Sequence, residues 1–187
     1  MDPLDKKYVV MTIVGMHAGK EISDIFSWKK NEIGQHGKTY WLAHSPKAKV
    51  SQVQDFCKQA HTEGEDVYCL FINASTKNGA RRTLHDSQAS CVSADGIEWR
   101  KLDEGLKVTG KIDKAATVLV FDRLETLTDL LQIDLWNYSE TNGAPMRFRL
   151  GASTACCQKN PSIGMKSHQR TIVGWARLKA PFAVYVK

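Results

Sequence analysis

Hydrophobic residues along the chain gather in short runs that predict buried strands. Residues 6–14 are apolar on both faces of a would-be strand, which is typical of a central position in a sheet. Shorter apolar runs over 39–43, 67–72 and 115–121 predict three more strands. A strand-rich core is therefore the first expectation.

The clearest helical pattern covers residues 46–61. Its apolar residues recur at steps of three and four, as expected for one face of a helix: Val50, Val53, Phe56, Cys57 and Ala60. Ser51 and Gln54 have the spacing of a capping box, and Gly64 suits the helix exit. The segments 39–43, 46–61 and 67–72 thus predict a strand, a helix and a strand in succession.

Two other segments leave the choice of element open. Residues 22–30 have helical spacing over a short length, and 31–37, with two glycines, indicate a loop. Residues 125–138 place leucines at helical steps in their first half, although Ile133 and Leu135 would also alternate along a strand. We expect a helix over at least the first half of this second segment.

Strict alternation marks the C-terminal quarter. Residues 146–150 place Arg147 and Arg149 on the face opposite their apolar neighbours. Residues 171–179 place Val173, Trp175, Arg177 and Lys179 on one face, and 182–186 predict a closing strand that pairs back as a hairpin. The fold class we expect is α+β, with a mixed, mostly antiparallel sheet or a small, partly open β-barrel and two or three flanking helices.

Length and composition agree with one ordinary globular domain over residues 1–187. The chain is 42% hydrophobic and 25% charged, and residues 73–90 are polar enough to predict a flexible loop. No apolar run reaches the roughly 18 residues needed to cross a membrane, and no signal peptide is visible. Five irregularly spaced cysteines argue against a secreted disulfide framework. These features predict a cytoplasmic protein, or a nuclear one in a eukaryote, without a membrane partner.

The net charge of +6 is unevenly distributed. Residues 141–187 contain eight Lys or Arg and no Asp or Glu, so the first 140 residues together carry a formal charge of −2. Such a bias favours a polyanionic partner and carries no information about the fold.

The basic quarter supplies the main functional hypothesis, a nucleic-acid-binding module. If the strands over 146–150 and 171–179 are neighbours, their cations surround an indole that can stack on a base. Two arginines of the polar loop would assist. The residues expected to contact DNA or RNA are Arg147, Arg149, Trp175, Arg177, Lys179, Arg81 and Arg82.

Two alternative functions remain open. Lys166, Ser167 and Arg170 could hold an anion beside His168, which would make the protein an enzyme acting on a phosphorylated or nucleic-acid substrate. A protein-interaction adaptor or inhibitor could instead use the basic face against an acidic partner. No catalytic motif, metal-ligand spacing or cofactor fingerprint is present, so we predict neither a metal nor a cofactor.

Overall fold

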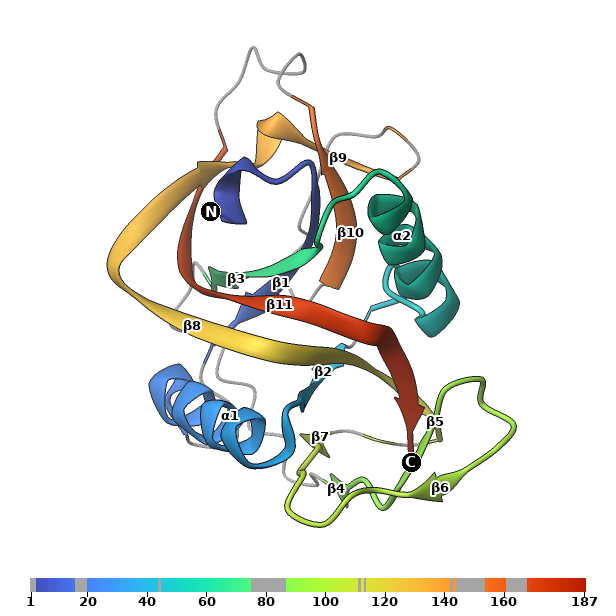
Figure 1. Ribbon diagram of the computed structural model, residues 1–187. Helices are drawn as coiled ribbons and strands as arrows, with labels where there is room; N and C mark the ends of the chain where they lie inside the picture. Colours follow the sequence, from blue (N-terminus) through green and yellow to red (C-terminus); the bar gives the residue numbers. More distant parts are fainter. Residues whose placement is uncertain are drawn as a thin grey trace.

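The computed structural model describes residues 3–15, 20–43, 45–74, 87–110, 112, 114–141, 143, 154–160 and 168–187, with backbone only for 130 and 136. Figure 1 shows two helices set against a long, strongly curved sheet. The elements, in chain order, are η1 Pro3–Asp5, β1 Tyr8–Val14, α1 Ile22–His36, β2 Thr39–Ala43, α2 Val50–Thr62, β3 Tyr68–Asn73, β4 Ser87–Gln88, β5 Cys91–Ser93, β6 Arg100–Lys101, β7 Thr109–Gly110, β8 Ala116–Asp134, η3 Leu135–Asn137, β9 Tyr138–Glu140, β10 Thr154–Lys159 and β11 Gln169–Val186.

The main sheet has the strand order β2-β8-β11-β3-β1-β10-β9, and β5 and β6 join it beside β11. Among the described strands, β1 and β3 form a parallel pair and the other pairs are antiparallel. The order runs from one edge to the other without closing into a barrel. The α+β class with a mixed, mostly antiparallel sheet is therefore confirmed.

Strand β1 contributes to two hydrophobic cores because its side chains alternate between the faces of the sheet. Val10 packs with Phe26 of α1, Phe56 of α2 and Phe71 of β3 on the helix-covered face. Val9 packs on the opposite face, where the far ends of β8 and β11 bend over the sheet. The prediction of a central strand over 6–14 is confirmed by this burial on both sides.

Among the described residues, neither helix is long and apolar enough to span a membrane.

Strands β8 and β11 form the longest ladder of the sheet and lie side by side from Gln169 opposite Asp134 to Val186 opposite Ala116 (Figure 1). Their register shifts at three places: between Ile172 and Gly174, between Arg177 and Leu178, and between Leu178 and Ala183. Each bulge increases the local twist and bends the ribbon. This bending lets one strand pair line the helix-covered core, the opposite core and a third core beside β5.

Gly174 occupies the tightest point of this ladder. A Cβ atom placed there would lie 2.6 Å from the carbonyl oxygen of Glu125 and 2.7 Å from the ring of Phe26. Both distances are below van der Waals contact, so only a glycine lets β11 approach β8 and α1 this closely.

Three sequence-based element predictions are wrong. Residues 125–134 continue β8 as a strand, where a helix was expected. The helix that begins at Ile22 extends to His36, through the segment expected to be a loop, and ends at Gly37 with φ 65°. Residues 182–186 belong to β11 itself and pair with β8 and β5, so they form no separate hairpin with 171–179.

Candidate nucleic-acid interface

Trp175 lies in the middle of β11, between β3 and β8, at the edge of the core formed with Val9 and Ile172. Its half-buried indole meets the ring of Tyr68 edge-on, with centroids 5.5 Å apart. The guanidinium carbon of Arg123 lies 5.1 Å from the centroid of the indole, within cation–π range. We call the surface made by Tyr68, Asp122, Arg123, Glu125, Trp175 and Arg177 the Trp175 surface.

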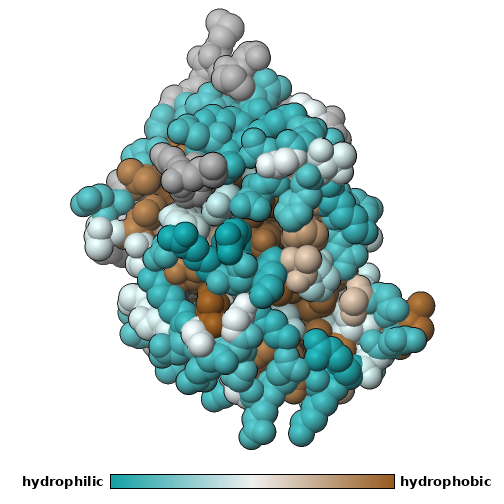
Figure 2. Space-filling model, in the orientation of Figure 1, coloured by the Kyte–Doolittle hydropathy of each residue, from teal (hydrophilic) through white to brown (hydrophobic). Residues whose placement is uncertain are grey.

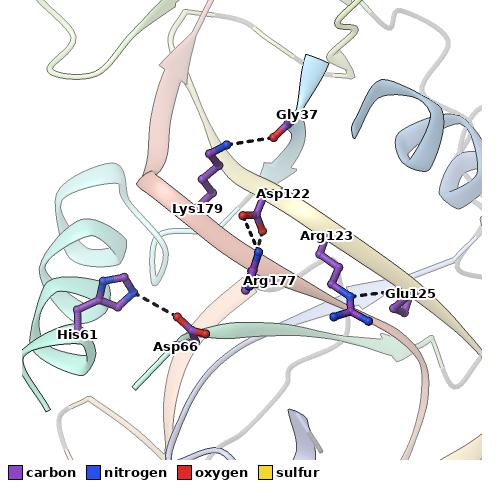
Figure 3. Close-up of polar contacts among 8 residues, drawn as sticks. All are labelled: Gly37, His61, Asp66, Asp122, Arg123, Glu125, Arg177 and Lys179. Atoms are coloured by element: carbon purple, nitrogen blue, oxygen red, sulfur yellow. Dashed lines mark hydrogen bonds and ion pairs between the residues drawn. The ribbon is translucent and has the colours of Figure 1, made fainter. Parts of the chain in front are cut away.

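Arg177 lies two residues further along β11 and is held by an acid. Its Nε and Nη2 each donate to a different carboxylate oxygen of Asp122, both at 2.9 Å (Figure 3). Asp122 occupies the bulge in β8 opposite the step from Arg177 to Leu178, which aims its carboxylate across the strand pair. These hydrogen bonds raise the pKa of the Arg177 guanidinium above its usual value. A planar, bidentate pair of this kind fixes the side chain as well as its charge.

The rest of the Trp175 surface also carries both signs of charge. Arg123 Nε donates to Glu125 at 3.2 Å, and the Lys30 ammonium of α1 lies 3.9 Å from the same carboxylate. His61 and Asp66 face each other at 3.9 Å on the other side (Figure 3). The sequence of β11 is free of acids, but β8 supplies Asp122 and Glu125, so this part of the sheet carries both signs of charge.

Lys179 is separated from that cluster. Its ammonium donates to the carbonyl oxygen of Gly37 at 3.2 Å and points away from Arg177 in Figure 3. It lies within the register shift between Leu178 and Ala183, where the regular alternation of β11 ends. The predicted grouping of Trp175 with Arg177 therefore holds, whereas Lys179 contacts the end of α1.

The remaining predicted contacts, Arg147, Arg149, Arg81 and Arg82, lie outside the described residues. The neighbours of Trp175 and Arg177 can nevertheless be stated, because both edges of β11 are occupied there, by β3 on one side and β8 on the other. The position of residues 146–150 relative to β11 lies outside the described residues and stays a prediction.

The anion loop proposed around His168 is described only in part, since Lys166 and Ser167 lie outside the described residues. The backbone N–H of His168 donates to Asp134 at 2.8 Å, and its carbonyl accepts from Leu135 at 3.1 Å. Arg170 follows in β11, half-buried opposite Ile133. These bonds anchor the backbone, but no described carboxylate binds the imidazole of His168 in the way that would orient a general base.

The cysteines lie in apolar surroundings. Cys156 and Cys157 point to opposite faces of β10 and are both buried. Burial raises the pKa of Cys156 to about 12 and that of Cys157 well above the ordinary value, so both thiols stay protonated. Within the described ranges, no group of three His, Cys, Asp or Glu side chains is placed to bind a metal ion.

Sequence reasoning missed Tyr68, Arg123 and Asp122 as members of the surface. The first two could have been found only from the pairing of β3 and β8 with β11, which no local pattern shows. Asp122 comes directly after the strand predicted over 115–121, but no local pattern indicates that it binds Arg177.

The face seen in Figure 2 is mostly hydrophilic, and hydrophobic atoms show in small separate areas. No protein-family model, no curated protein and no solved structure shows significant similarity to the chain. Inference about function therefore rests on the chemistry of the surface alone.

Proposed function

We propose that the protein is a nucleic-acid-binding module that uses the Trp175 surface. The observation that supports this best is the indole of Trp175 beside a guanidinium, with Tyr68 of the neighbouring strand β3 packed edge-on against it. An aromatic ring and an adjacent cation match a base and its phosphate, and stacking on such a ring contributes about 1–3 kcal/mol per base.

The two arginines of the surface have different roles in this proposal. Arg123 is 58% exposed and its acid partner Glu125 is 40% exposed, so their ion pair contributes little and a phosphate can displace it. Arg177 donates two hydrogen bonds to the carboxylate of Asp122 and is therefore fixed in position. Arg123 is therefore the phosphate contact, and Arg177 holds the strand pair that carries Trp175.

The mixture of charges favours a single-stranded ligand. A duplex needs a row of cations to follow its backbone, whereas a single strand can stack one or two bases and touch few phosphates. The proposal retains five further phosphate contacts. The acid-free sequence from 141 to 187 supports Arg147, Arg149 and Lys179, and the basic character of the polar segment 73–90 supports Arg81 and Arg82.

The test is fluorescence anisotropy with labelled single- and double-stranded DNA and RNA, from low to physiological salt. We expect single-stranded ligands to bind more tightly and affinity to fall steeply with salt. Arg123→Glu should lower affinity about tenfold or more. Lys101→Glu makes the same change of charge on the exposed strand β6 and is the matched control, for which we expect little change.

A second variant tests the two predicted contacts, Arg147 and Arg149, that rest on the sequence alone. Reversal of both Arg147 and Arg149 to Glu should abolish binding. If no ligand binds at low salt, or if Arg123→Glu and Trp175→Leu proteins that fold normally bind like the original, the proposal is wrong.

A further inference from the structure

A hollow lies between the first half of α1 and the segment before β7. Its volume is about 330 Å³, and Lys20, Asp24, Trp28 and Lys107 line it. Asp24 and Trp28 are four residues apart on the helix and so share a face. We call this hollow the Trp28 cleft, and none of its four lining residues belongs to the Trp175 surface.

The indole of Trp28 forms a half-buried wall between ammonium groups. The Nζ of Lys29 lies 5.2 Å from the centroid of this ring, and the Nζ of Lys107 lies 5.5 Å from it. The Lys29 side chain is only 8% exposed, and its ammonium binds Glu32 Oε2 at 3.0 Å and the carbonyl oxygen of Lys107 at 2.5 Å. This ammonium is already neutralised inside the protein and does not contribute a free charge to the cleft.

The same buried pair fixes the backbone from which Lys107 extends. The Lys107 carbonyl accepts from Lys29, and the Lys107 N–H donates to Glu32 Oε1 at 3.1 Å. Its side chain is exposed, and within the described residues neither Lys107 nor Lys20 has a carboxylate within ion-pair distance. Asp24 is the one acid in the lining. The cleft thus has a rigid aromatic wall and two free ammonium groups.

We propose that the Trp28 cleft binds a nucleotide, with the base on Trp28 and the phosphate between Lys20 and Lys107. Asp24 accepts a hydrogen bond from a sugar hydroxyl or a base amino group. The volume is at the lower end of the range for small-ligand sites, which suits one nucleotide. The nucleotide is either free in solution or one unit of a polynucleotide, since both present the same base and phosphate.

This inference does not depend on the Trp175 surface. An inorganic anion alone would leave the indole unused, and an uncharged aromatic compound would leave the two ammonium groups unused. A ligand that combines a flat ring with a phosphate satisfies both parts of the lining.

The experiment is calorimetric titration of the whole chain at low salt with adenosine monophosphate, uridine monophosphate, adenosine, inorganic phosphate and a short single-stranded oligonucleotide. We expect the monophosphates to bind at millimolar or lower concentration, and adenosine and inorganic phosphate each to bind about tenfold more weakly or not at all. Lys107→Gln and Trp28→Leu should each lower monophosphate affinity about tenfold. Lys101→Gln is the matched control and should leave the affinity unchanged.

Two comparisons make the result decisive. If inorganic phosphate or adenosine binds as tightly as the monophosphates, or if Lys107→Gln has no effect on any nucleotide ligand, the proposal is overturned. If only the oligonucleotide binds and Lys107→Gln weakens it, the nucleotide is a unit of a polynucleotide. The effect of Lys107→Gln on monophosphate affinity should persist in an Arg123→Glu background, so failure at one site is distinguishable from failure at the other.

Discussion

Replacement of Glu32 by Gln tests how much the fold depends on its buried ion pair. The Lys29 and Glu32 side chains are 8% and 3% exposed. Glu32 accepts from three donors, the Lys29 ammonium, the Lys107 N–H and the Thr39 hydroxyl, and so ties α1 to β2 and to the segment before β7. Glu32→Gln leaves the ammonium of Lys29 buried without a counter-charge.

The expected loss is about 3–5 kcal/mol of unfolding free energy, the usual cost of breaking one partner of a buried pair. For a chain of this size it corresponds to a fall in melting temperature of about 6–20 °C. Burial already lowers the pKa of Lys29 below its ordinary value, and only Glu32 opposes this shift. The folded state therefore releases the proton of Lys29 at a lower pH than the unfolded state does. Because the unfolded state binds more protons in this range, the Glu32→Gln variant should regain stability as the pH rises toward 10.5.

Urea unfolding followed by circular dichroism, at about pH 7 and about pH 9, measures both effects. The double variant Lys29→Met, Glu32→Gln removes both charges and keeps a side-chain oxygen that can accept from the Lys107 N–H or the Thr39 hydroxyl; it should be more stable than Glu32→Gln alone, because no buried charge is left without a partner. Lys30→Met changes an exposed neighbour and should shift stability by no more than about 0.5 kcal/mol. A loss below about 1 kcal/mol in Glu32→Gln, or an equally unstable double variant, would refute the reasoning.

Three further outcomes are expected. Gly174→Ala should lower the free energy of unfolding by about 1–3 kcal/mol, because its Cβ collides with the backbone of β8. Gly34→Ala, in open space on α1, should raise it by up to about 1 kcal/mol. Equal effects of the two variants in thermal unfolding would contradict this. A thiol reagent should modify the half-buried Cys91 first and the other cysteines only after unfolding, as counted by mass spectrometry. Asp122→Ala removes the carboxylate that fixes Arg177 and so loosens the strand pair that carries Trp175; it should lower oligonucleotide affinity, and unchanged affinity would count against this role of Arg177.

The elements that the sequence predicts well are those with a regular period and a single environment. The strand over 39–43 has the predicted bounds, and the predicted helix over 46–61 overlaps α2 for most of its length. The prediction for 125–134 fails because β8 is bulged there: a step of five residues, from Thr126 to Leu131, lies opposite a step of only two residues of β11. Leucines at irregular spacing resemble a helical stripe, and no local pattern distinguishes the two.

The candidate interface shows the same limit. Alternation along 171–179 correctly places Trp175 and Arg177 on one face, because that information lies within a single strand. The placement of Val173 on the same face is wrong, because the register shifts between Ile172 and Gly174 and Val173 packs against the opposite core. The acid that binds Arg177 and the cation beside Trp175 come from β8, which is distant along the chain and adjacent only in the folded sheet. The charges along one segment of the sequence could therefore identify the cations of β11, but not the residues of β8 that contact them.

The central position of β11 also has a consequence for how the protein forms during synthesis. Strand β11 lies between β3 and β8, and both of these strands precede it along the chain. Until β11 is in place, β3 and β8 therefore each have one edge without its hydrogen-bonding partner. A nascent chain would expose the apolar side chains of both strands throughout that interval, and pairings this distant in sequence form slowly. We therefore expect the newly made polypeptide to depend on chaperones more than a helical protein of similar length.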